Sequence, residues 1–185
     1  MSTSRTMHFV TPTYRPAGGV VKVMDYVTHA LSLGYRVSVQ CNAPRKDAEE
    51  LFSIERFRPL TEHPDVEFHH RRRLDVDGDD LVLISLPTNY EMALASLAPT
   101  MVPDRIIHII QNVRHVNPEW LDGQPVRTLT RPASRISINS IVGDAIEPYI
   151  DPRGLHRVIN LGHELSYFRQ ERTGGLGAPI RVAYT

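Results

Sequence analysis

Two adjacent glycines, Gly18 and Gly19, are the residues whose type and placing most clearly suggest chemistry in this sequence. They join a short apolar run at 8–11, typical of a buried strand, to an amphipathic segment at 18–33 that Gly34 ends as it would a helix. The first amide hydrogens of a helix lack intrahelical partners and lie at the positive end of its dipole. Because glycine has no Cβ, an anion can approach closely, so the pair predicts a seat for a phosphate or carboxylate, with Arg15 beside it.

Two plainer interpretations of this segment stay open. A glycine pair before a helix is commonly a tight turn, and an arginine in a loop is commonly solvated. The segment matches neither the GxGxxG pattern of dinucleotide-binding proteins nor the GxxxxGKS or GxxxxGKT pattern of P-loops. The anion seat is therefore a hypothesis that depends on the elements around the loop.

Polar side chains also follow the apolar strand predicted at 105–110. Five residues could contact a ligand there, two directly after the strand and three in the loop beyond: Gln111, Asn112, Arg114, His115 and Trp120. An acceptor could lie on the indole face and bond to the neighbouring polar groups, although Trp120 covering the end of the sheet is an equal alternative. Within the strand, His108 is interpreted as a hydrogen-bonded core histidine.

Strand and helix patterns alternate along the chain. Strands are predicted at 8–11, 36–41, 66–69, 80–86, 105–110, 135–138 and 157–159, and helices at 18–33, 47–57, 90–97 and 140–149, with Thr88 or Asn89 and Asn139 or Ser140 as caps. This order predicts an α/β fold with a doubly wound, Rossmann-like parallel sheet covered by helices on both faces. In such sheets ligands bind outside the carboxyl ends of the strands, where the glycine pair and Gln111 are expected.

The composition of the chain argues against several classes of function. The 185 residues include 21 basic and 21 acidic side chains, so no net field attracts nucleic acid or an anionic membrane. Cys41 is the single cysteine, which fits a reducing compartment, and no signal peptide or membrane span is apparent, so a cytoplasmic protein is expected. His69 and His70 lack a third ligand, and residues 75–80 lack the closing glutamate of a calcium loop, so no metal site is predicted.

Three segments together resemble the N-terminal domain of glycosyltransferase family 4 enzymes, which have the GT-B fold. The first is PAGGVVKVMDYVTHALSLGYRVSVQC, where a Gly-Gly loop leads into a helix and a strand. The second is RISINSIVGDAIEPYI, and the third is VINLGHELSYF, similar to the interdomain crossover with Gly162, Glu164 and Phe168 at the matching positions. The stretch that ends at Asn112 looks closest to the rhamnosyltransferase-like branch.

This resemblance implies sugar transfer from a nucleotide-sugar to the hydroxyl of a sugar or lipid-linked acceptor, with retention at the anomeric carbon. The nucleotide-sugar is a co-substrate, no separate cofactor is implied, and the longer enzyme could associate peripherally with a membrane. Gly18 and Gly19 match the loop that lies against the donor diphosphate, and Gly162 and Glu164 match the domain junction. Many family members have a histidine where Gln111 stands; because an amide exchanges no proton, we expect Gln111 to recognise a sugar, and the catalytic residues stay unassigned.

The resemblance also implies a division of the chain. Residues 1–169 are expected to form the acceptor-side domain, 170–179 a linker, and 180–185 the first strand of a missing donor-binding domain, without which no turnover is expected. A non-catalytic, flavodoxin-like module that binds a small anionic ligand is the alternative, since it needs only the glycine loop and the sheet. Nicotinamide-dependent reduction is disfavoured because Gln40 and Cys41, not an acidic residue, end the second strand.

Overall fold

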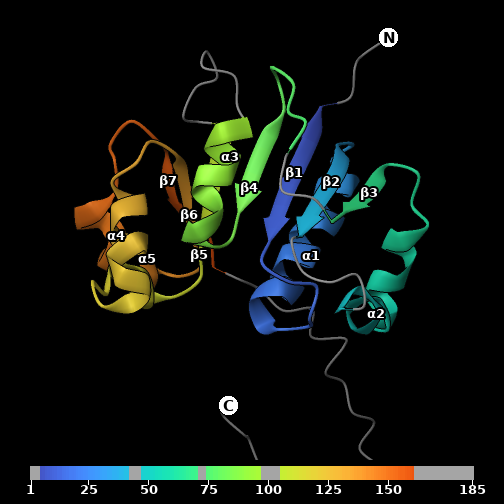
Figure 1. The fold of residues 1–185 in the computed structure, drawn as a ribbon, viewed down its shortest axis with the longest axis horizontal. Helices are drawn as coiled ribbons and strands as arrows, with labels where there is room; N and C mark the ends of the chain where they lie inside the picture. Colours follow the sequence, from blue (N-terminus) through green and yellow to red (C-terminus); the bar gives the residue numbers. More distant parts are fainter. Residues whose placement is uncertain (1–4, 42–46, 71–73, 97–104, 161–185) are drawn as a thin grey trace, which may run out of the picture.

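The computed structural model describes residues 5–41, 47–70, 74–96 and 105–160. Within them, seven parallel strands form one sheet in the order β3-β2-β1-β4-β5-β6-β7 (Figure 1). The strands are β1 (Thr6–Thr11), β2 (Arg36–Cys41), β3 (Val66–His69), β4 (Leu81–Ile84), β5 (Ile106–Ile110), β6 (Ser134–Ser137) and β7 (His156–Val158). The helices are α1 (Gly18–Ser32), α2 (Asp47–Phe52), α3 (Tyr90–Ser96), α4 (Gln124–Leu129) and α5 (Ser140–Ile146). The predicted α/β, doubly wound class is confirmed.

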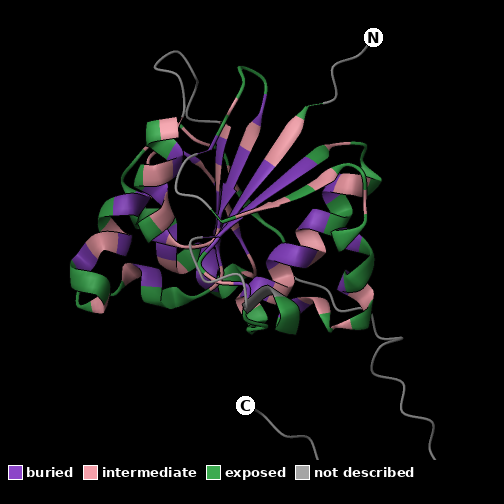
Figure 2. Ribbon diagram, turned by 45° about the vertical axis from the view of Figure 1, so that its right-hand side comes forward, coloured by how far each residue is buried: buried purple, intermediate pink, exposed green. Residues whose placement is uncertain are grey.

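Helices cover both faces of this sheet because side chains alternate along each strand. Phe9, Leu83 and Ile109 pack in one core cluster with the buried stripe of α1. The intervening positions, such as Val82 and Ile106, pack with α3 on the other face. In Figure 2 the strands are largely buried while the outer surfaces of the helices are exposed.

The segment that carries the glycine pair folds as the sequence predicts. Helix α1 begins at Gly18, and Gly34 follows its end with φ +82°, a left-handed conformation that favours glycine. The buried positions Val20, Val23, Met24, Val27 and Ala30 repeat at helical spacing. This apolar stripe fixes α1 against the sheet and so sets where its amino end lies.

Two predicted helices are shorter than the sequence patterns suggest. The helix expected at 47–57 ends at Phe52 and is followed by the 3-10 helix η1 (Glu55–Thr61), because Ile54 is extended and the Ser53 hydroxyl donates to the Glu50 carbonyl. The helix expected to reach Tyr149 ends at Ile146 and becomes the 3-10 turn η6 (Glu147–Tyr149). Pro148 explains that end, since its ring disfavours further α-helix.

The predicted caps are confirmed at one helix and differ at another. The Asn139 Oδ1 atom accepts the Val142 N–H at 2.9 Å and caps α5. Before α3, residues Pro87–Asn89 form the 3-10 turn η2, and the Asn89 side chain donates to the Val10 carbonyl at 3.5 Å instead. Asn89 therefore links the ends of β4 and β1.

The long connection after β5, which the sequence predicts to be a loop, contains three short helical elements. They are η4 (Val113–Val116), η5 (Trp120–Gly123) and α4. Leu121 and Asp122 adopt left-handed conformations with φ near 50°, and Gly123 has φ 72°. This turn of the backbone directs the chain from Trp120 into α4.

Candidate functional site

Three loops meet at the carboxyl edge of the sheet beside the topological switch point. The chain runs from β1 to β2 on one side and enters β4 on the other side of β1, so the order of strands reverses there. The Asn89 side chain reaches the end of β1, and Gln111 Nε2, just past β5, donates to the Gly19 carbonyl at 3.4 Å. The glycine loop and Gln111, each expected at this edge, are therefore in contact in this structure.

Gly19 lies so close to Gln111 that a side chain would not fit without movement. A Cβ built at Gly19 would lie 2.7 Å from Gln111 Oε1, whereas a Cβ at Gly18 meets no atom within 4 Å. The glycine at 19 thus admits the amide of Gln111, and the glycine at 18 leaves an open approach to the backbone. This difference between the two glycines could not be read from the sequence.

The amino end of α1 is accessible to a ligand. Ala17, at the N-cap, makes no side-chain capping hydrogen bond, and the first hydrogen bond of the helix runs from the Val21 N–H to the Ala17 carbonyl. Ala17 and Gly18 are exposed, as is Arg15. Backbone N–H groups and the positive end of a 15-residue helix dipole therefore face the edge where Gln111 lies.

The loop after β5 presents polar groups near this edge. Asn112 Oδ1 accepts the Arg114 N–H at 2.9 Å and so caps η4, while both residues are exposed. Trp120 is half-buried, with its ring 5.2 Å from that of His115. His115 itself is only 2% exposed, so its ring supports Trp120 from within the protein.

His108 and His115 form a buried pair of imidazoles with centroids 5.3 Å apart. Burial lowers the pKa of His115 to about 4, and the nearby Arg135 charge adds to this effect. Burial also holds the pKa of His108 well below its usual value, with His115 and Arg135 contributing. The prediction of a core histidine is confirmed, but the expected hydrogen bonds are wrong: neither ring nitrogen of His108 has a partner among the described residues.

A second series of hydrogen-bonded polar side chains, which the sequence did not predict, links β6, β7 and the 3-10 turn η6 that precedes β7. Ser137 Oγ lies 2.9 Å from His156 Nε2, and His156 Nδ1 lies 2.7 Å from Glu147 Oε2. The order resembles a Ser-His-acid triad, but Ser137 is fully buried and no substrate could reach it. We therefore interpret these bonds as a tie between the two strands, one that residue types alone would not reveal.

Several predictions concern residues outside the described structure. Gly162 and Glu164 lie outside the described residues, as do the linker at 170–179 and the strand at 180–185. In the described ranges, no group of three histidine, cysteine or acidic residues is arranged to hold a metal ion. A helix long and apolar enough to cross a membrane is likewise not found in the part of the chain that was searched.

Comparisons with known proteins give no independent assignment. We found no match for this chain among protein-family models, curated protein sequences or solved structures. Any function proposed for this chain therefore depends on the site and on the residues that resemble a family, not on a relative.

Proposed function

We propose that this chain is the acceptor-side domain of a retaining glycosyltransferase, and that its carboxyl edge receives the diphosphate of a nucleotide-sugar. The observation that supports this most is the approach of Gly19 to Gln111 at the open amino end of α1. There, unpaired N–H groups suit phosphate oxygens, and an amide that both donates and accepts suits sugar hydroxyls. The order of the strands places this combination at the edge where α/β proteins bind ligands.

The roles of the site residues follow from their chemistry. Gly18, Gly19 and Arg15 contact the diphosphate, and Gln111 contacts a sugar hydroxyl without exchanging a proton. Asn112, Arg114 and the face of Trp120 contact the acceptor, and His115 acts by supporting Trp120. In this proposal the residues that carry out the transfer itself belong to a second domain, so this chain binds substrates and does not turn them over alone.

Binding to the purified chain tests this proposal. Calorimetric titration with inorganic pyrophosphate, nucleoside diphosphates and a panel of nucleotide-sugars should give the tightest binding with a nucleotide-sugar. Gly19→Val should weaken that binding at least about tenfold, because the added methyl groups fill the space that the ligand and Gln111 share. Gln111→Glu should weaken pyrophosphate binding more than Gln111→Ala does, since only the carboxylate repels the ligand.

Gly78→Val is the matched control, because a Cβ at Gly78 meets nothing within 4 Å and the residue is exposed in the loop before β4. It should leave affinity unchanged. Binding of pyrophosphate with no gain from the nucleoside or sugar would favour the non-catalytic anion-binding module. A wild-type chain that binds none of these ligands would contradict the proposal.

A further inference from the structure

A buried arginine occupies the strand next to the imidazole pair. Arg135, on β6, is 2% exposed, which is unusual for a residue that is always charged. In the sheet it lies opposite His108, so the two side chains project from the same face. That face is the one covered by α3, α4 and α5.

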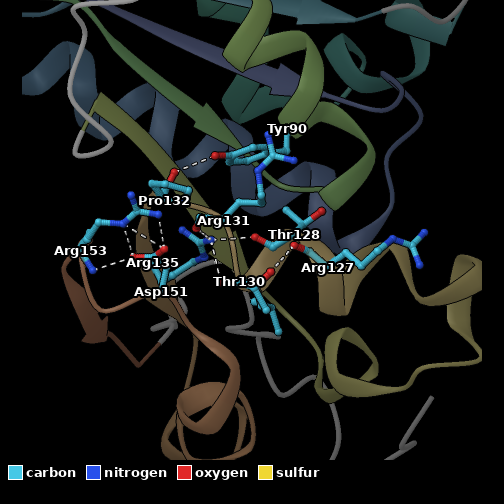
Figure 3. Close-up of polar contacts among 10 residues, drawn as sticks. Tyr90, Arg127, Thr128, Thr130, Arg131, Pro132, Arg135, Asp151 and Arg153 are labelled. Carbon is cyan, nitrogen blue, oxygen red and sulfur yellow. Dashed lines mark hydrogen bonds and ion pairs between the residues drawn. The ribbon is translucent and has the colours of Figure 1, made fainter.

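Arg135 is held by the end of helix α4. Its Nη2 atom donates to the carbonyls of Thr128, Leu129 and Arg131 at 3.0, 3.3 and 2.8 Å (Figure 3). These carbonyls lie at the negative end of the helix dipole, where a cation is stabilised. Meanwhile Nε and Nη1 are buried and have no hydrogen-bond partner among the described residues.

Packed rings connect this buried charge to the candidate site. His108, beside Arg135 in the sheet, packs against His115, which packs against Trp120. A second connection runs through the backbone, because α4 begins directly after the turn that contains Trp120. Arg127 Nη1 donates to the Asp122 carbonyl at 2.7 Å and fastens that turn to α4.

We propose that Arg135 is a positioning residue for Trp120: it anchors the carboxyl end of α4 and, through the rings of His108 and His115, fixes the place of the indole at the carboxyl edge. The role depends on the proposed function only in its last step, the contact of Trp120 with an acceptor. Both routes from Arg135 end at the η5 turn. Loss of the guanidinium would therefore loosen the turn from two sides.

The same charge has an electrostatic consequence. Burial is the main reason that both imidazoles stay neutral well below the ordinary histidine pKa, and the Arg135 charge adds to it, because a proton on either ring would lie in a buried region that already contains a cation. Tyr90 on α3 and Asp151 before β7 act on Arg135 itself. Helices α4 and α5 both pack on η4. Their charged residues, Arg127 on α4 and Asp144 on α5, are exposed in the described structure.

Trp120 provides its own probe, since it is the only tryptophan of the chain. A protonated imidazole quenches the fluorescence of an indole in contact with it, so emission should fall as His115 titrates. In the wild type we expect a midpoint near pH 4. Arg135→Met should raise the midpoint by roughly half a pH unit, because the Arg135 charge adds to the larger effect of burial, whereas Arg135→Lys keeps the charge and should leave the midpoint near the wild-type value.

Control variants separate this role from a merely structural one. His115→Phe should abolish the transition, and Arg153→Met, at an exposed arginine nearby in Figure 3, should not move it. Far-UV circular dichroism at each pH identifies unfolding. A structural cap alone would lower the melting temperature of Arg135→Met and leave its midpoint unchanged, and that result would overturn the proposal.

A measurement on the wild type keeps the test decisive if Arg135→Met does not fold. NMR titration of the His115 ring should give a pKa near 4, mainly because the ring is buried between His108 and Trp120, and a value near 6.5 would overturn the proposal, since the ring would then not be packed in the route from Arg135 to Trp120. Neither readout needs a ligand. Failure to bind a nucleotide-sugar would therefore contradict the proposed function but not the role proposed for Arg135.

Discussion

At the scale of single residues, much of the chemistry of this protein depends on contacts that cannot be predicted from residue types alone. The glycine pair could be singled out from the sequence because glycine before a helix has a known physical meaning. Its contact with Gln111 could not, because the two residues are 92 positions apart in the chain. The same holds for Asp80, the first residue of the strand predicted at 80–86, which the fold buries against His8.

Asp80 provides a residue-scale prediction of stability. Its carboxylate accepts the Thr6 and Asp77 N–H groups and lies 3.1 Å from His8 Nε2. Burial raises its pKa, but these hydrogen bonds outweigh burial and leave the pKa below its usual value. Asp80→Asn should therefore lower the free energy of unfolding by about 1–3 kcal/mol at pH 7, measured by urea denaturation.

The neighbouring carboxylate is the control for this measurement. The Asp79 side chain is 74% exposed, so Asp79→Asn should lower the free energy of unfolding only slightly. Because the folded pKa of Asp80 is lowered, its contribution is present at neutral pH and is lost as the pH falls through that value, so the two variants should converge in acid. If both variants lost the same free energy of unfolding at pH 7, the buried carboxylate of Asp80 would contribute no more to stability than the exposed carboxylate of Asp79.

At the scale of elements, the sequence predicted best where local signals and tertiary packing agree. The continuous apolar runs of β4 and β5 and the stripe of α1 were read correctly because burial on a parallel sheet demands them. The elements after Trp120 were not foreseen, since a left-handed turn at Leu121 and Asp122 has no glycine at those positions to signal it. That turn is held by contacts with α4, which only the folded chain supplies.

The cap of α5 is the element whose energy can be measured most directly. Asn139→Ala removes the acceptor for the Val142 N–H and should cost about 1 kcal/mol of unfolding free energy. Asn139→Asp keeps an acceptor and should retain most of the stability, and Ser140→Ala, one residue into the helix, should have a small effect. If Ser140→Ala cost more than Asn139→Ala, the helix would be capped by the serine instead.

At the scale of the whole molecule, one sheet positions two kinds of polar chemistry at different places, one accessible to ligands and one buried. The carboxyl edge near β1 and β5 has an open helix end, while the face beneath α4 contains a cation and two neutral rings. The β-α alternation predicts a parallel sheet, and the observed strand order brings the residues of the first together. The second depends on the register of β5 against β6, which pairs His108 with Arg135 and which no local pattern encodes.

This arrangement makes the stability of the molecule depend on pH below neutrality. His108 and His115 titrate near 6.5 when unfolded and well below that when folded, so the unfolded chain binds more protons as the pH falls below 6.5. Stability is unaffected by these two groups above that pH. Below it, down to about pH 4, His115 should remove about 1.4 kcal/mol of unfolding free energy per pH unit, and His108 should act in the same direction.

Urea denaturation at steps from pH 7.5 to pH 4.5 measures this slope, and the comparison with His115→Phe isolates the contribution of one ring. The variant should lose stability less steeply with falling pH than the wild type does, because one of the two proton-binding differences is gone. Parallel curves for the two proteins would mean that His115 titrates alike in the folded and unfolded chains. In that event the Arg135 charge would not affect the pKa of His115, and the coupling between β6 and the Trp120 turn would be limited to packing.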